Sequence, residues 1–229
     1  MDFEKRRRRL VAQLRHEVKD ERVLEAIAKV RRELFVPEAH RHLAYEDMAL
    51  PIEEGQTISQ PLIVAMMLSS LELKPTDKAL EVGTGSGYQA ALLSLLAQDV
   101  VSTERVPALA ELARRRLAEM GYSNVKVVQA GEALGCPEEG PYDAIVVAAG
   151  GPYLPLSLIG QLKEGGRLVI PVGSRLEQQL MKIVKTKDGY YVQTLGPCRF
   201  VPLIGAGAWN DDGDGGEEGR LTRAASRRS

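Results

Sequence analysis

The pattern of apolar positions separates a helical N-terminal stretch from a longer stretch in which strands and helices alternate. In residues 3–34 the apolar side chains recur three or four positions apart, which predicts helix. The helix is expected in two pieces with a break near Lys19–Asp20. Pro37 then ends it, because proline cannot continue a helix.

From residue 61 onward, helical stretches alternate with short apolar runs, as in a sheet of parallel strands covered by helices. Strands are predicted at residues 79–82, 99–103, 125–129, 143–148 and 167–171. Helices are predicted at residues 61–71, 89–97, 107–120 and 155–162. Residues 179–186 and 190–194 alternate apolar with polar side chains around an Asp-Gly turn, which predicts a β-hairpin. Residues 198–203 give a last extended piece, and the chain is expected to have an α/β fold.

Residues 45–61, YEDMALPIEEGQTISQP, connect the two parts and carry hydroxyl side chains at Thr57 and Ser59. One interpretation is a surface loop in which Ser59 N-caps the following helix, with Pro61 near its first position. The other is a loop that lies across the mouth of a ligand site and directs its hydroxyls at a substrate. Both interpretations can hold at once.

Three glycines, Gly83, Gly85 and Gly87, directly follow the predicted strand at 79–82 and precede a helix. A strand, a glycine turn and a helix together present backbone N–H groups and a helix N-terminus to a ligand. Glycine suits such a turn because a side chain would block close approach of the backbone, and because some turn positions need a positive φ.

The spacing and charge around this turn favour S-adenosylmethionine as the cofactor. The pattern E-x-G-x-G-x-G lacks the G-x-G-x-x-G spacing that suits a pyrophosphate, and no Lys-Ser or Lys-Thr follows as in a P-loop. Acids mark three consecutive strand ends: Glu81, Glu104 and Glu132. Glu104 lies about 20 residues past the turn, where nucleotide-binding folds place a carboxylate for the ribose hydroxyls. Acids suit a sulfonium and an ammonium group and would repel phosphates, so the sequence predicts a methyltransferase.

Composition and charge bear on which partners the protein binds and in which compartment it is found. A net charge of −1 gives no case for a nucleic-acid partner. No apolar run approaches the roughly 20 residues of a membrane span, and the N-terminus lacks the apolar core of a signal peptide. Cys136 and Cys198 lack metal-ligand spacing and point to a reducing, cytoplasmic compartment, with a single disulfide left open. His16, His40 and His42 have no partners at ligand spacing, so no metal site is expected.

Five stretches carry a more specific signal. They are residues 55–61 (GQTISQP), 80–88 (LEVGTGSGY), 142–145 (YDAI), 162–173 (LKEGGRLVIPVG) and 199–203 (RFVPL). On these residues the sequence closely resembles the protein-L-isoaspartate O-methyltransferases, the repair enzymes that methylate isoaspartyl residues. The resemblance extends from about residue 5 to Trp209. The glycine motif is common to methyltransferases, whereas residues 55–61 and 199–203 are typical of this family.

The resemblance implies a Rossmann-like S-adenosylmethionine-dependent methyltransferase fold. Its sheet would have seven mostly parallel strands, with helices on both faces and an N-terminal helical segment. The implied reaction moves a methyl group from S-adenosylmethionine to the α-carboxylate of L-isoaspartyl residues in age-damaged peptides and proteins. The domain is expected to span residues 1–209, with residues 1–60 supplying the N-terminal helices and active-site loop, and 61–209 the cofactor-binding sheet and C-terminal strands. Residues 210–229 are mostly polar and glycine-rich and are predicted to be disordered.

The resemblance also implies roles for individual residues. Ser59 would be the catalytic residue. The cofactor would be bound by Gln56, Thr57, Ile58, Glu81, Gly83, Thr84, Gly85, Ser86, Gly87, Glu104, Arg105, Glu132 and Ala133. The substrate would be bound by Thr57, Ser59, Arg199 and Val201. For Glu81, contact with the cofactor's amino group through a water and stabilisation of the turn both remain open. The chain departs from the family at Glu132, where Asp followed by Gly is usual.

Two other functions remain open from the sequence. One is S-adenosylmethionine-dependent methylation of another acceptor. A nucleic-acid acceptor is disfavoured, because residues 148–153 (AAGGPY) lack an Asn/Asp-Pro-Pro-Tyr type motif. The other is a non-catalytic adaptor that binds the cofactor or isoaspartyl proteins, against which the intact loop at 56–59 argues. No nucleic-acid or membrane partner is expected. The protein is expected to be a monomer.

Overall fold

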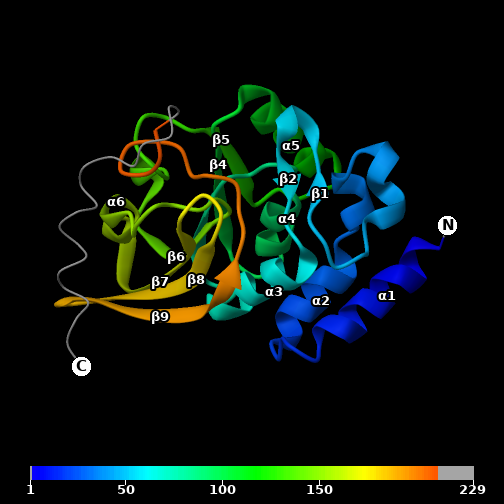
Figure 1. The fold of residues 1–229 in the computed structure, drawn as a ribbon, viewed down its shortest axis with the longest axis horizontal. Helices are drawn as coiled ribbons and strands as arrows, with labels where there is room; N and C mark the ends of the chain where they lie inside the picture. The colour runs from blue at the N-terminus through cyan, green and yellow to red at the C-terminus, as the bar shows by residue number, and fades with distance from the viewer. Residues whose placement is uncertain (1, 211–229) are drawn as a thin grey trace.

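The computed structural model describes residues 2–210, so the predicted disordered tail, Asn210 apart, lies outside the described residues. The fold centres on a seven-stranded sheet with the order β5-β4-β3-β6-β7-β8-β9 (Figure 1). Its strands are β3 (Lys78–Val82), β4 (Asp99–Glu104), β5 (Val125–Gln129), β6 (Tyr142–Val147), β7 (Leu162–Gly173), β8 (Gln178–Thr186) and β9 (Gly189–Cys198). The strands from β5 to β7 run parallel, whereas β8 and β9 are antiparallel to their neighbours. The mostly parallel seven-stranded sheet expected from the sequence is confirmed.

The sheet separates two apolar cores, and alternate residues of each strand contribute to opposite cores. In β3, Ala79 belongs to one core and Leu80 to the other; in β6, Ala144 and Ile145 divide in the same way. A strand that is buried on both faces needs apolar residues at every position. This explains why the central strands read as continuous apolar runs.

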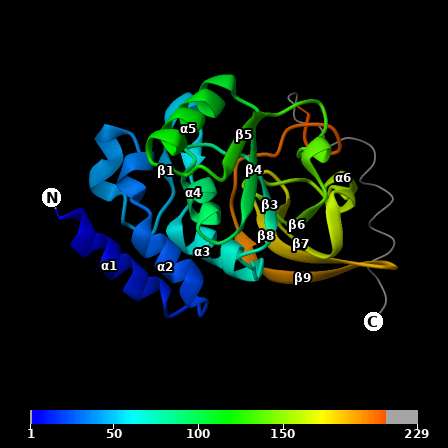
Figure 2. The ribbon, with the colours of Figure 1, turned by 180° about the vertical axis from the view of Figure 1, so that it is seen from behind.

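Helices cover the two faces unequally. The main helices are α1 (Phe3–Leu14), α2 (Glu21–Lys29), α3 (Pro61–Ser70), α4 (Tyr88–Ser94), α5 (Pro107–Glu119) and α6 (Leu156–Gly160). Side chains of α1 to α5 pack in one core, and those of α6 pack in the other. Figures 1 and 2 both show α1 and α2 on the side of the molecule that carries the N-terminus, with β7 to β9 on the opposite side.

The N-terminal helical stretch is shorter than its apolar pattern predicted. The break falls where expected, because Asp20 caps α2 and ends the connection from α1. However, α2 stops at Lys29, since Val30 has an extended backbone. The chain continues in two 3₁₀ helices, η1 (Arg32–Phe35) and η2 (Glu38–Leu43).

The C-terminal part also differs from the pattern. The hairpin of β8 and β9 forms as predicted, with β9 extending to Cys198. The next residues, 199–203, do not continue a strand of the sheet, and they form an isolated bridge between Pro202 and Gly150, which follows β6. They therefore return across the end of the sheet toward β6.

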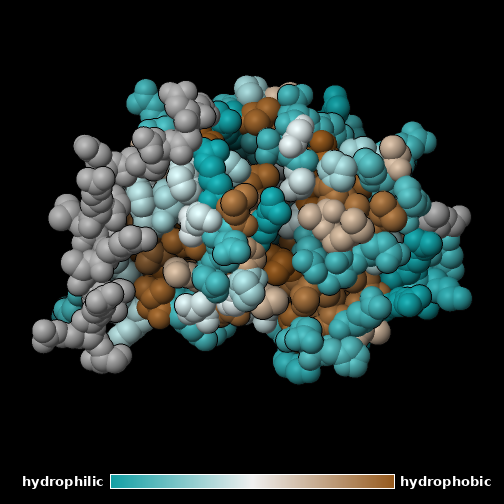
Figure 3. All heavy atoms as spheres, in the orientation of Figure 1, coloured by the Kyte–Doolittle hydropathy of each residue, from teal (hydrophilic) through white to brown (hydrophobic). Residues whose placement is uncertain are grey.

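The surface is polar over the outer side of α1, and apolar side chains gather nearer the middle of the same face (Figure 3). No helix in residues 2–210 has both the length and the apolar character needed to cross a membrane.

Candidate active site

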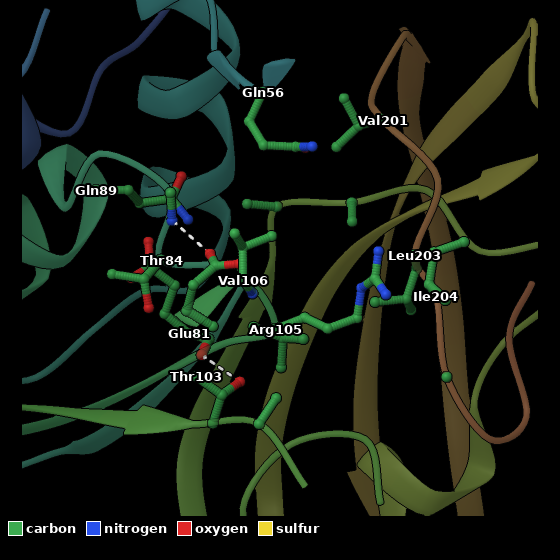
Figure 4. Close-up of a pocket in the computed structure, with 18 of the residues that line it drawn as sticks. Gln56, Glu81, Thr84, Gln89, Thr103, Arg105, Val106, Val201, Leu203 and Ile204 are labelled. Atoms are coloured by element: carbon green, nitrogen blue, oxygen red, sulfur yellow. Dashed lines mark hydrogen bonds between the residues drawn. The ribbon is translucent and has the colours of Figure 1, made fainter. Parts of the chain in front are cut away.

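A cavity of about 560 Å³ opens at the carboxyl ends of the parallel strands. It lies where the strand order reverses between β3 and β6, which is where open α/β sheets bind ligands. The segments that follow β3, β4, β5 and β6 line it, together with residues 55–59 and 201–205 (Figure 4).

The glycine turn after β3 forms the floor of this cavity. The backbone N–H groups of Gly83 and Thr84 donate to the carbonyl of Thr103 at 2.8 and 3.1 Å, which ties the turn to β4. The φ angles of Gly83, Gly85 and Gly87 are 97°, 52° and 88°, a region that other residues rarely adopt. The glycine spacing in the sequence is therefore set by backbone conformation as well as by ligand access.

Glu104, at the end of β4, reaches back to the same turn. One carboxylate oxygen accepts the Gly85 N–H at 2.8 Å, and the other accepts the Val106 N–H at 2.9 Å. The side chain is buried and lines the cavity. Each carboxylate oxygen has a second lone pair, so Glu104 retains the capacity to accept hydrogen bonds from a ligand.

Glu81 is fully buried at the end of β3 and belongs to a chain of polar side chains. One of its oxygens accepts the Ser102 hydroxyl at 2.5 Å, and Ser102 in turn pairs with the Thr84 hydroxyl. Burial raises the pKa of Glu81 to about 8, with the nearby charge of Glu104 adding to the rise.

The second oxygen of Glu81, Oε1, and Nε2 of buried Gln89 make no hydrogen bond of normal geometry with the described residues, although the nearby Gln89 amide acts to lower the pKa of Glu81. Both side chains line the cavity. Unpaired buried polar atoms are rare in proteins, because leaving one unsatisfied costs about 1–3 kcal/mol. The two atoms are therefore available to a ligand. Gln89 was not predicted as a site residue, although its position just after the glycine turn, at the start of a helix, is a signal for one.

Residues 48–59 form a lid over one side of the cavity. Within the lid, β1 (Leu50–Pro51) pairs with β2 (Thr57–Ile58), and Ile58 is buried. Gln56 and Ser59 line the cavity. The Ser59 hydroxyl has no hydrogen bond to any residue of the described chain, so it is free to contact a ligand.

The expectation that Ser59 caps α3 is wrong. The N-cap of α3 is Gln60, with Pro61 in the first turn as predicted, and the Gln60 side chain makes no cap hydrogen bond. The N–H of Leu62 instead donates to the carboxylate of Asp47, from the far side of the lid.

Residues 199–203 form the opposite wall. The Gly150 N–H donates to the Val201 carbonyl at 2.7 Å, and the Leu203 N–H donates to the Gly150 carbonyl at 2.8 Å. The Phe200 N–H donates to buried Gln178 at 2.7 Å. The Val201 N–H has no partner among residues 2–210, and Val201 faces Gln56 across the cavity (Figure 4).

The third wall is the segment after β5. Glu132 and Ala133 line the cavity there, and the side chain of Gln161 supports this segment through the Cys136 N–H and the Leu134 carbonyl. Arg105 extends toward Leu203 and Ile204 at the mouth (Figure 4).

Most of the site residues expected from the sequence line this one cavity. Those that do so are Gln56, Thr57, Ile58, Ser59, Glu81, Gly83, Thr84, Gly85, Ser86, Glu104, Arg105, Glu132, Ala133 and Val201. Gly87 and Arg199 are not among the lining residues. Gly87 is buried, with Ala113 and Leu117 of α5 directly behind it, so it positions the start of α4. Arg199 is exposed.

The histidines and cysteines stay outside this chemistry. Among the described residues no group of His, Cys, Asp and Glu side chains could hold a metal ion. Cys136 and Cys198 are free thiols, which answers the disulfide question that the sequence left open.

Parallel strands that present a glycine turn, two buried acids and a hydroxyl-bearing lid to one cavity define the fold and site of an S-adenosylmethionine-dependent methyltransferase. The model of the family "Protein-L-isoaspartate(D-aspartate) O-methyltransferase (PCMT)" matches residues 5–208. The chain belongs to this family, and it is a protein-L-isoaspartate O-methyltransferase by descent.

Individual relatives agree with this assignment. A protein-L-isoaspartate O-methyltransferase of Protochlamydia amoebophila is 55% identical over 194 residues, which cover 84% of this chain and 92% of the relative. One from Syntrophobacter fumaroxidans is 50% identical over 211 residues, covering 91% of this chain and 99% of the relative. Among solved structures, a protein-L-isoaspartate O-methyltransferase has a TM-score of 0.79 at 31% identity, over 87% of this chain and 66% of that chain.

A second solved structure, from Plasmodium falciparum, is described as a putative enzyme of the same family in complex with S-adenosyl-L-homocysteine. It has a TM-score of 0.75 at 28% identity and covers 87% of this chain and 99% of that chain. The resemblance stated from the sequence is thereby confirmed.

Proposed function

We propose that the cavity binds S-adenosylmethionine between the strand ends and the lid, and that an isoaspartyl α-carboxylate enters between the lid and Val201. The observation that carries this proposal is the pair of unpartnered buried atoms, Glu81 Oε1 and Gln89 Nε2, in the cavity that Ser59 also lines. An acceptor and a donor side by side suit the ammonium and carboxylate groups of an amino acid.

The remaining parts of the cofactor have matching partners along the cavity. Glu104 would accept hydrogen bonds from the ribose hydroxyls, using the lone pairs that its backbone contacts leave free. Glu132, Ala133 and Leu134 would lie beside the adenine. Glu132 is exposed, so its longer side chain can turn toward solvent without blocking the cavity.

The reaction requires the protein mainly to align the acceptor carboxylate with the methyl group. When bound, S-adenosylmethionine would supply a methyl group on its sulfonium sulfur. A carboxylate oxygen would bond to the methyl carbon as the carbon–sulfur bond breaks, which gives a methyl ester and S-adenosylhomocysteine. The acceptor carboxylate is already ionised near neutral pH, so no general base is needed and the histidines have no role in the reaction. Holding reacting atoms in line can contribute about 7–11 kcal/mol.

Ser59 would supply that alignment. Its free hydroxyl donates a hydrogen bond that orients the acceptor carboxylate, and Thr57 supports the lid beside it. Because carboxylate and sulfonium neutralise each other during transfer, a strong oxyanion hole would oppose the reaction. One hydroxyl therefore suits the task better than a cluster of cations.

Residues 199–203 would recognise the substrate backbone. The Val201 N–H is unpaired beside the cavity and can donate to a substrate carbonyl, as in the addition of a strand. Recognition through the main chain tolerates many sequences, as damaged peptides and proteins with isoaspartyl residues require. We further propose that the protein works as a cytoplasmic monomer, without a nucleic-acid or membrane partner.

Methyl transfer from tritiated S-adenosylmethionine tests this function directly. An isoaspartyl peptide is compared with the same peptide containing a normal aspartyl residue and with a nucleic acid. We expect base-labile methyl ester on the isoaspartyl peptide alone. Label on the nucleic acid or equal label on both peptides would contradict the proposed acceptor, and binding without transfer would indicate an adaptor.

A further inference from the structure

The turn before the lid carries Asp47, whose carboxylate crosses the base of the lid. Its two oxygens accept the side-chain amide of Gln60 at 2.9 Å and the backbone N–H of Leu62 at 2.8 Å. The first N–H groups of a helix have no partner within the helix, and Gln60 does not cap α3 with its own side chain. Asp47 therefore caps α3 from outside, where the helix dipole also favours a negative charge.

The residues on both sides of Ser59 are held in place by hydrogen bonds or burial. Before it, Ile58 is buried and paired with Leu50 in the ladder of the lid. After it, Gln60 and Leu62 are held by Asp47. The backbone of Ser59 is thus held on both sides, while its hydroxyl stays free for a ligand.

A buried cation holds the turn that presents Asp47. Arg32 is fully buried, and it donates to the carbonyls of Ala44 at 2.8 Å and Met48 at 3.4 Å. Its guanidinium also stacks on the ring of Tyr88, 4.9 Å from the ring centroid, and Tyr88 lines the cavity. The backbone on both sides of Asp47 is therefore fixed against the wall of the site.

We propose that Asp47 is a positioning residue for methyl transfer, because it sets the place from which Ser59 meets the acceptor carboxylate. The inference rests on the role of Ser59 proposed above. Removing the carboxylate frees one arm of the lid but leaves the glycine turn, Glu81 and Glu104 in place. The rate of transfer should therefore fall while the affinity for the cofactor product holds.

The test compares two Asp→Ala variants that each remove a helix cap. Asp47→Ala should lower the single-turnover rate on an isoaspartyl peptide about 10- to 100-fold, since small misplacements of reacting groups have effects of this size. The calorimetric Kd for S-adenosylhomocysteine should stay nearly unchanged. Asp20→Ala is the matched control, because Asp20 caps α2 through the N–H groups of Arg22 and Val23 at 3.0 and 3.3 Å. It should lower Tm to a similar degree and leave the rate unchanged.

Two milder variants keep the inference testable if Asp47→Ala does not fold. Asp47→Asn keeps one oxygen to accept the two hydrogen bonds, from the Gln60 amide and the Leu62 N–H. Gln60→Ala removes the first of these donors and leaves the hydrogen bond from Leu62 intact. Both should have rates between those of the parent protein and Asp47→Ala. Full activity in both would overturn the inference, as would equal rates for Asp47→Ala and Asp20→Ala, or a loss of S-adenosylhomocysteine affinity that parallels the loss of rate.

The double variant Ser59→Ala/Asp47→Ala separates this inference from the proposed function. It should be no slower than the slower single variant, because both changes remove the same contact. A fully active Ser59→Ala would contradict the role of Ser59 itself. Two results would overturn only the role of Asp47. One is a lowered transfer rate in Ser59→Ala together with an unchanged rate in Asp47→Ala. The other is a loss of rate in the double variant that equals the combined losses of the two single variants.

Discussion

Glu81 and Glu104 carry the same functional group but face the cavity in different environments. Glu104 accepts two backbone N–H bonds, one on each oxygen. Glu81 is fully buried and receives one hydroxyl bond, so burial raises its pKa to about 8. The sequence showed two acids at strand ends, but their difference depends on Ser102 and on depth in the sheet, which only the tertiary structure fixes.

The raised pKa of Glu81 predicts that cofactor binding depends on pH. Near neutral pH the carboxyl of the free protein is mostly protonated, whereas a cationic amino group favours its ionised form. The affinity for S-adenosylhomocysteine should therefore rise with pH up to about 8, with release of a proton on binding below that pH. Calorimetry in buffers of different ionisation enthalpy measures both effects.

Glu81→Gln is the control, because it keeps the shape but cannot ionise. Its affinity for S-adenosylhomocysteine should be weaker and flat over the same pH range. The same slope in Glu81→Gln and the parent protein would assign the pH dependence to another group.

Replacing Glu104 tests the ribose contact. Glu104→Ala should weaken S-adenosylhomocysteine by roughly 1.5–3 kcal/mol, the range for hydrogen bonds to a charged group. Isothermal titration measures the loss, and Glu119→Ala, at the end of α5, serves as the control. An unchanged Kd in Glu104→Ala would mean that its carboxylate serves only the backbone N–H groups of Gly85 and Val106.

At the scale of elements, the strands and helices were predictable where burial imposes a simple pattern. The continuous apolar runs of β3 and β6 follow from cores on both faces, and the glycine turn follows from its φ angles. The start of α3 at Pro61 was predicted, but its cap was not, because the cap comes from Asp47 and not from the adjacent Ser59. A contact between separate parts of the chain leaves no signal in the local sequence.

The wall at residues 199–203 lacks strand pairing along its length, which explains why its extended pattern did not mark a strand of the sheet. Val201→Pro removes the one unpaired N–H proposed to meet the substrate. KM should rise for all isoaspartyl peptides alike, with the Kd for S-adenosylhomocysteine unchanged. Val201→Ala keeps the N–H and should retain most of the affinity. An effect confined to one peptide sequence would contradict recognition through the main chain.

At the scale of the whole molecule, the site joins parts that are distant in sequence. The lid comes from the N-terminal part, the acids from the middle and Val201 from the C-terminal part, and all meet where the strand order reverses. The sequence motifs predicted most of these residues as site residues. Only the structure shows that Gln56 faces Val201 across the cavity (Figure 4).

The exposed edge of the sheet bears on the oligomeric state. β9 is an edge strand with exposed Tyr191 and Val192, a surface that can pair with another chain. Its pairing with β8 is interrupted by an irregularity, and Pro197 lies within it, both features that discourage pairing between edges. We therefore expect a monomer of 25.0 kDa by light scattering after size exclusion. A mass of twice this value that falls on Tyr191→Lys substitution would show that the edge pairs.

If the wall at residues 199–203 recognises the main chain of its target, as proposed, it also limits where the enzyme can act. The damaged stretch would then have to lie extended beside Val201, which a residue inside a folded helix or central strand cannot do. The rate of methylation in a folded protein would then depend on how often the altered stretch unfolds locally. Isoaspartyl residues in flexible loops and termini would be methylated first. Damage in a rigid interior would persist until its host unfolds.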